Sequence, residues 1–199
     1  MQFNQSQTKI SIARAFAGLC QDAARYQFMA KDARDDGMEY LSTLLEGMGK
    51  HKIGQSQRLY NLMLELSENK KDNVVIEAGY PFEDNKITIS LERAGIIEEY
   101  EGKNLFAQFV RVATDEGFKE IAGVFELIGK VSHKHSRILK TLAQNYNKRQ
   151  LYKNSKPLTW TCSNCGHSIE DKSAWLVCPL CKKPKGYVMI PEEKLTSGE

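Results

Sequence analysis

Four cysteines are spaced as two C-x-x-C pairs near the end of the chain. Cys162 and Cys165 form the first pair, and Cys178 and Cys181 form the second after a spacer of twelve residues. Each pair folds as a tight knuckle that points both thiolates inward, so two pairs bring four sulfurs together. A tetrahedral set of thiolates suits zinc or a single iron. The spacing therefore predicts a metal site, with two disulfides or four ordinary buried cysteines as the alternative.

The composition is that of an ordinary soluble protein. Hydrophobic residues make up 41% and charged residues 27% of 199 residues, enough for one substantial core and a small metal-stapled module. No apolar run approaches the roughly 18 residues that span a bilayer, and the first residues lack the pattern of a secretory signal. We therefore expect a cytoplasmic protein, whose reduced thiols bind metal. The small net charge of +3 gives no reason to expect nucleic acid or a membrane as a partner.

Apolar residues recur at helical spacing over most of the chain before position 148. Ser6 or Asn4 is expected to cap the first helix, and Gly37 to end it in the left-handed conformation. Residues 67–85 are polar and contain turn signals, so they predict a crossover. The short joint at 115–117 makes the last two helices antiparallel neighbours. The four predicted helices span about 6–36, 38–66, 88–116 and 118–147.

Two helical hairpins joined by one long crossover describe an all-α, ferritin-like four-helix bundle. The cysteine segment that follows is too small to fold without its metal. It is therefore expected to form a small β/loop metal domain, which the motifs named in the next paragraph make similar to a rubredoxin-like domain. The predicted organisation is a bundle at 1–147, a polar linker at 148–156, the metal domain at 157–191 and a disordered polar tail at 192–199.

Short motifs along the whole chain carry a family resemblance. They are Ala15-Phe16-Ala17-Gly18, Arg25-Tyr26, Arg58-Leu59, Glu116-Gly117-Phe118, Glu120-Ile121-Ala122, and the cysteine pairs with Trp160, Gly166 and Pro179. Together they resemble the rubrerythrin family. The resemblance implies a bundle that holds two irons and reduces hydrogen peroxide. It also implies that a rubredoxin-like iron relays the electrons.

In that family, helices one and three supply Glu, helices two and four each supply Glu-x-x-His, and helix three adds a carboxylate one turn on. Of the matching positions here, only Glu98, Glu101 and His135 keep a ligating side chain. Lys52 stands where a Glu is expected. The positions that match the family's di-iron ligands are Leu19, Lys52, Gln55, Glu98, Glu101, Ser132 and His135.

The charge of Lys52 opposes metal binding at this place. At about 4 Å and an effective dielectric constant near 20, an ammonium repels each divalent ion by roughly 8 kcal/mol. We therefore expect no catalytic di-iron centre in the bundle. Lys52 is instead expected to form a buried ion pair with Glu98 and Glu101, which lie three residues apart on one helical face.

These observations favour one function and leave two alternatives. The leading hypothesis is one-electron transfer through a rubredoxin-type iron held by the four cysteines, with the bundle as a scaffold for a homodimer. A redox protein such as a rubredoxin reductase would be its partner. One alternative is a hydrogen peroxide reductase that uses residual metal at Glu98, Glu101 and His135. The other is a structural or regulatory protein with zinc in the four-cysteine site.

Overall fold

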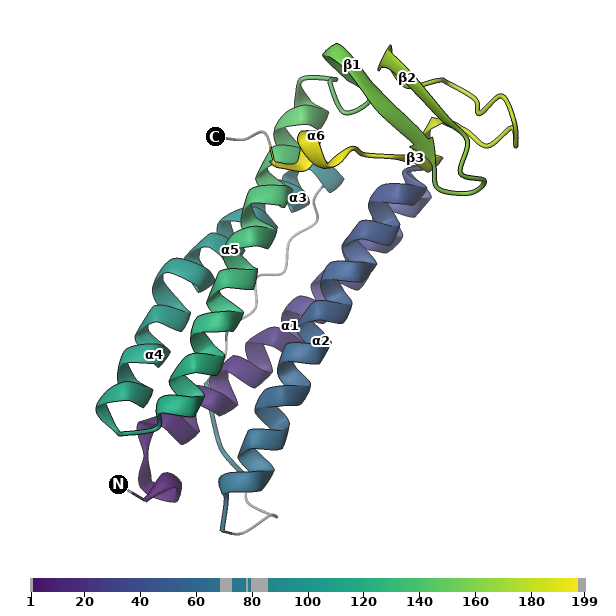
Figure 1. Cartoon of the computed structure of the whole chain (residues 1–199). Helices are drawn as coiled ribbons and strands as arrows, with labels where there is room; N and C mark the ends of the chain where they lie inside the picture. Colours follow the sequence, from purple (N-terminus) through teal and green to yellow (C-terminus); the bar gives the residue numbers. More distant parts are fainter. Residues whose placement is uncertain (1, 69–72, 78, 80–85, 197–199) are drawn as a thin grey trace. The chain divides into compact units, whose positions relative to one another are not determined.

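The computed structural model describes residues 2–68, 73–77, 79 and 86–196. Figure 1 shows long helices followed by a small sheet. Among the described residues, no helix is long and apolar enough to span a membrane. The elements are η1 (Phe3–Gln5), α1 (Gln7–Asp35), α2 (Glu39–Leu66), α3 (Ile87–Tyr100), η2 (Glu101–Leu105), α4 (Phe106–Asp115), α5 (Lys119–Asn147), β1 (Lys153–Cys162), β2 (Ser168–Ser173), η3 (Lys185–Tyr187), β3 (Val188–Met189) and α6 (Glu192–Thr196).

The chain divides into two compact units. The first comprises 1–26, 47–84 and 98–134, and the second comprises 27–46, 85–97 and 135–199. The second unit thus joins parts of the long helices to the cysteine segment. These units do not follow the predicted boundary between a bundle and a separate metal domain, and each is described by itself below.

The predicted ends of α1 are confirmed. The Ser6 hydroxyl accepts a hydrogen bond from the Lys9 amide at 3.1 Å, the bond expected of a helix N-cap. At the other end, Gly37 has a φ of 75°. The amide of Met38 donates to the carbonyl of Ala33, which completes a Schellman motif.

The third predicted helix is not a continuous α-helix. The α-helical pattern is interrupted at η2, a π-helical turn that begins at Glu101. A Cβ at Gly102 would lie 2.9 Å from the carbonyl oxygen of Gly129, so α5 approaches this turn closely. Glycine is required at this crossing because a side chain would separate the two backbones. Of the predicted crossover at 67–85, the described residues are in neither helix nor strand, and the rest lie outside the described residues.

The first unit has an extensive apolar core. Aromatic rings contribute much of it; the rings of Phe109 and Phe125, for example, have centroids 5.3 Å apart. Its buried members are Phe3, Ile12, Ala15, Leu19, Leu59, Leu62, Phe106, Phe109, Ala113, Ile121, Ala122, Phe125 and Ile128. This core fixes the helices that carry the buried charges described below.

The second unit contains a three-stranded antiparallel sheet in the order β2-β1-β3. Trp160 on β1 is fully buried, and its indole N–H donates to the Asp171 carbonyl at 2.9 Å. It packs with Ala174 and Val188. This small core lies beside the cysteine knuckles, because β1 ends at Cys162.

Regular structure lies in two ranges of the second unit that were expected to be a linker and a tail. Strand β1 begins at Lys153, inside the range predicted as a linker. Residues 192–196 form α6 rather than a disordered tail. Lys194 is buried, its ammonium donates to the Lys153 carbonyl at 2.8 Å, and its own carbonyl accepts from the Asn145 amide group at 3.1 Å. The backbone carbonyl of Lys153 and the side-chain amide of Asn145, both distant in sequence, thus hold this polar segment in place.

Candidate functional sites: a four-cysteine centre and a buried lysine cluster

The four predicted cysteines meet at one point in the second unit. Their sulfur atoms all lie within 4.8 Å of one another. The Sγ atoms of Cys162 and Cys181 are 3.6 Å apart, and those of Cys165 and Cys178 are 3.7 Å apart. A metal with bonds of 2.3 Å to a regular tetrahedron of sulfurs requires edges of about 3.8 Å. A disulfide would bring two sulfurs to about 2.05 Å. The four side chains therefore fit one tetrahedral metal ion, and the disulfide alternative is wrong.

The two knuckles repeat the same backbone turn. In each, the residue after the second cysteine has a positive φ, 73° at Gly166 and 61° at Lys182. Each of these residues donates its amide to the carbonyl of the first cysteine in its knuckle, at 2.9 and 3.0 Å. Glycine adopts this conformation at no steric cost, whereas lysine does not. The motif thus predicts the first turn through Gly166 but not the second.

Burial divides the ligands into two kinds. Cys162 and Cys178 are buried, while Cys165 and Cys181 are half-buried. The centre therefore lies close to the surface on the side of Cys165 and Cys181.

A second polar cluster lies in the first unit, around the fully buried Lys52. Its ammonium lies 2.9 Å from a Glu98 oxygen and 3.0 Å from a Glu101 oxygen. The predicted ion pair is thus confirmed. The ammonium also donates to the Ser132 hydroxyl at 3.4 Å. Helix α2 therefore points Lys52 at the face of α3 and η2 that carries both carboxylates.

Asp22 is a member of the cluster that sequence reasoning missed. Its carboxylate lies 3.0 Å from the Lys52 ammonium, and Arg25 contacts its other oxygen at 3.0 Å. Asp22 is three residues after Leu19, so both lie on the same face of α1. A search of that helical face for carboxylates would have found it, whereas the family's ligand pattern does not include it.

Tyr26 adds a donor to the cluster. Its hydroxyl donates to the second oxygen of Glu98 at 2.5 Å. Burial raises the pKa of Tyr26 well above its usual value, and the adjacent Glu98 raises it further. The phenol therefore stays protonated, and Glu98 accepts hydrogen bonds on both of its oxygens.

The cluster carries more negative than positive charge. Three carboxylates face Lys52 and the less buried Arg25. Burial alone would lower the pKa of Lys52, but Asp22, Glu98 and Glu101 outweigh it, so its pKa lies above the usual range. Burial raises the pKa of Glu101 to about 8, against the opposing attraction of Lys52.

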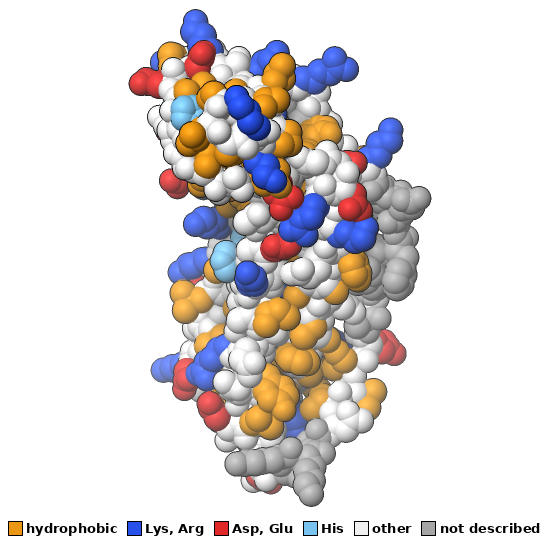
Figure 2. Space-filling model, turned by 90° about the vertical axis from the view of Figure 1, so that its right-hand side faces the viewer, with side chains coloured by type: hydrophobic (Ala, Val, Ile, Leu, Met, Phe, Trp, Pro, Cys, Tyr) orange, Lys and Arg blue, Asp and Glu red, His pale blue; other side chains and the backbone are white. Residues whose placement is uncertain are grey.

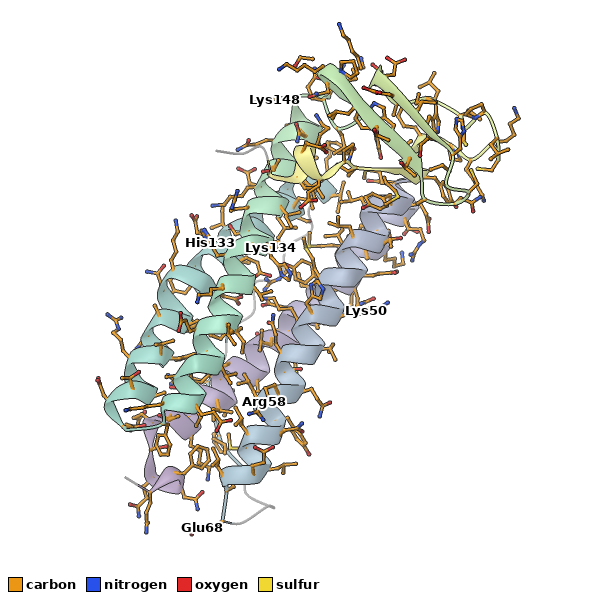
Figure 3. The ribbon with its side chains drawn as sticks, viewed as in Figure 1. Lys50, Arg58, Glu68, His133, Lys134 and Lys148 are labelled. Atoms are coloured by element: carbon orange, nitrogen blue, oxygen red, sulfur yellow. The ribbon has the colours of Figure 1, made fainter. Side chains whose placement is uncertain are left out.

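The remaining predicted site residues take different positions. Leu19 is part of the apolar core of the first unit. Gln55 is half-buried, and its side-chain oxygen has no hydrogen-bond partner among the described residues. His135 is buried on α5 within the second unit. Residues 133 and 134 of α5 are exposed, as Figure 3 shows for His133 and Lys134.

The spacing of the ligand atoms within each cluster shows which of the two clusters suits a metal ion. Within the part of the chain that the structure describes, the four cysteines are the one group of three or more His, Cys, Asp or Glu residues whose ligand atoms all lie within 4.8 Å. The oxygens around Lys52 instead surround a nitrogen at hydrogen-bonding distance.

Comparisons with known proteins agree with this architecture. The chain is 30% identical to a rubrerythrin of Clostridium perfringens, over 94% of this chain and 96% of that protein. It is 27% identical to a rubrerythrin of Nitratidesulfovibrio vulgaris, over 92% and 93%. A solved structure of nigerythrin matches with a TM-score of 0.61 and 21% identity, over 92% of this chain and 86% of that one. The predicted ferritin-like fold with a small C-terminal sheet and four-cysteine cluster is thereby confirmed. The rubrerythrin family model matches residues 11–143, and the chain belongs to the rubrerythrin family.

Proposed function

We propose that this chain is a one-electron carrier whose working centre is an iron held by Cys162, Cys165, Cys178 and Cys181. The observation that carries the proposal is the tetrahedral fit of four sulfurs, two of them half-buried at the surface. Iron bound by four thiolates exchanges one electron between its ferrous and ferric states. The flanking residues Trp160, Gly166 and Pro179 resemble those of rubredoxin and favour iron over zinc.

The bundle, in this proposal, holds no catalytic di-iron centre. Lys52 occupies the place of a ligand and already brings three carboxylates around its own ammonium. Metal–oxygen bonds of about 2.0–2.2 Å would require these oxygens to close in on the same point. A charged lysine there would repel each iron by roughly 8 kcal/mol. The cluster then serves to hold the helices together.

A hydrogen peroxide reductase is the second candidate. Family membership and the excess of carboxylates favour it, because an anionic cluster attracts a cation if Lys52 moves away. The Lys52 ammonium opposes it, because it already supplies a cation among these carboxylates. Zinc in the four-cysteine site, giving a structural or regulatory protein, is the third candidate, because thiolates bind zinc readily.

The proposal includes partners and a compartment. The protein would act in the cytoplasm, where the thiols stay reduced until they bind metal. It would form a homodimer through its helices and receive electrons from a redox protein such as a rubredoxin reductase.

Metal analysis and a visible spectrum of protein isolated from its native cell test the proposal. We expect one iron per chain and a red oxidised form that bleaches on reduction. Peroxide should reoxidise the reduced protein no faster than it reoxidises free rubredoxin. Additional iron with rapid, stoichiometric peroxide turnover would establish the reductase instead, and a colourless protein with one zinc would establish the third candidate.

A matched gain-of-function variant checks the account of the bundle. Restoring the family's residues with Leu19→Glu, Lys52→Glu, Gln55→His and Ser132→Glu should recruit iron beyond the four-cysteine centre. Iron content that stays unchanged would show that the four positions do not explain the missing metals.

A further inference from the structure

The segment that carries the second knuckle is strongly basic. Residues 172–191 contain four lysines and no Asp or Glu. Lys182 directly follows the ligand Cys181 and is exposed. The ammonium of Lys183 lies over the ring of Tyr187, 4.9 Å from its centroid, which holds that charge close to the knuckle. The half-buried ligand Cys181 is therefore adjacent to fixed positive charge.

The same segment exposes large apolar side chains. Leu176, Val177 and Leu180 are 74%, 53% and 65% exposed, and none belongs to the core around Trp160. Leu180 lies inside the knuckle, between the two ligands Cys178 and Cys181. Single exposed hydrophobic residues are common, but three within five residues at a redox ligand are not explained by packing. Figure 2 shows orange side chains with blue ones among them at the upper end of the visible face.

We propose that this knuckle face, defined as Leu176, Val177, Leu180, Lys182 and Lys183, docks an acidic surface of a one-electron redox protein. The inference rests on the proposed function and specifies its partner. Apolar side chains at the centre exclude water, and a charged rim steers and orients the partner. The lysines here select a rim of Asp and Glu on the other protein and reject a basic one.

The exchange at this face balances simply. One electron passes between the docked partner's centre and the four-cysteine centre, so one protein is oxidised as the other is reduced. No bond forms or breaks. Cys181, half-buried beside Lys182, gives the shorter route to the surface than the buried Cys178.

The test measures binding without electron transfer. The full chain is loaded with zinc, which occupies the four sulfurs and is redox-silent, and is titrated calorimetrically with a ferredoxin of strongly negative net charge. We expect binding that weakens as salt is added. Lys182→Glu should weaken it by about tenfold, and Leu180→Ser by about fivefold.

The control is Lys156→Glu, an exposed charge reversal on β1 six residues before Cys162. It makes the same change in net charge, and we expect less than about a twofold effect because it lies outside the face. Equal losses for Lys156→Glu and Lys182→Glu would overturn the inference, since attraction would then follow net charge alone. Undetectable binding of the wild type, or tighter binding of a basic cytochrome c, would also overturn it. So would variants that lower self-association instead, because the face would then contact a second copy.

These results are separable from the proposed function. The zinc-loaded protein binds or fails to bind whether or not iron is the native metal. A titration without binding would contradict the docking proposal but not the proposal of an iron centre. Zinc in the native protein would contradict the electron-carrier proposal and would not affect the titration result.

Discussion

The lysine cluster and the four-cysteine centre meet the same electrostatic demand in opposite ways. Each collects anionic side chains from separate segments of its unit. Around Lys52, the chain itself supplies the cation on a covalently attached side chain. The four sulfurs, by contrast, lie within 4.8 Å of one another in an arrangement that fits a metal ion, a cation that would come from solution. A lysine side chain supplies the counter-charge from within the chain, whereas four thiolates would depend on a bound metal ion for theirs.

The largest effect on either site is expected from removing one cysteine of the four-cysteine centre. Cys178→Ser should lose the metal and unfold the segment around the knuckles, because binding of zinc contributes about 10–16 kcal/mol to small zinc domains. Metal content and the near-ultraviolet signal of buried Trp160 measure the effect. Cys20→Ser, a cysteine on α1 outside the cluster, is the control and should bind metal normally. The helical signal should largely remain; its loss would show that the helices depend on the metal.

Removing the internal cation comes next. Lys52→Met leaves buried carboxylates without their counter-ion and should destabilise the protein by about 3–5 kcal/mol. Denaturant unfolding measures this. The matched control is Lys130→Met, whose exposed pair with Glu126 should contribute much less to the free energy of unfolding. A Lys52→Met protein as stable as wild type at every pH would refute the buried ion-pair account.

The charge excess of the lysine cluster predicts a pH dependence. Glu101 has a folded-state pKa of about 8, above its ordinary value of 4.5, so the folded state binds the extra proton between these values. The free energy of unfolding should therefore fall as pH rises through this window, by up to about 1.4 kcal/mol per pH unit. Glu101→Gln should flatten the profile. In Lys52→Met the fall should extend to higher pH, because the ammonium that lowers the pKa of Glu101 is gone.

Glu126→Gln is the control for this profile. Glu126 is exposed, and the adjacent Lys130 lowers its pKa, so its own contribution changes only below its ordinary pKa. Identical profiles for wild type and Glu101→Gln would show that Glu101 is ionised throughout the range.

The smallest expected effect concerns the hydrogen bond from Tyr26 to Glu98 in the lysine cluster. Tyr26→Phe removes the donor to Glu98 and should cost about 1.5–3 kcal/mol, the range for hydrogen bonds to charged groups. Tyr60→Phe, at an exposed position, should change the unfolding free energy by less than about 0.5 kcal/mol. Equal effects of the two substitutions would mean that Glu98 does not need the phenol.

Much of the molecule is predictable where a spacing forces a geometry. The cysteine pairs predict the four-sulfur cluster, and the register of the family's ligands places Lys52 opposite Glu98 and Glu101. Asp22 escapes that register because it lies one turn beyond Leu19. The π-helical turn has no signal in the helical periodicity; Gly102 within this turn lies close to α5, a tertiary contact that the sequence does not display. Helix α6 has no sequence signal either, since its anchors are the backbone carbonyl of Lys153 and the side-chain amide of Asn145, both in distant segments.

The left-handed backbone at Lys182 has a consequence for how this knuckle tolerates change. A glycine there, as at Gly166 in the first knuckle, would relieve about 1–2 kcal/mol of steric cost. Lys182→Gly should therefore give a module that is harder to melt but carries one charge fewer beside Cys181. A residue at position 182 thus gives either lower backbone strain or a positive charge beside Cys181. This chain has the charge.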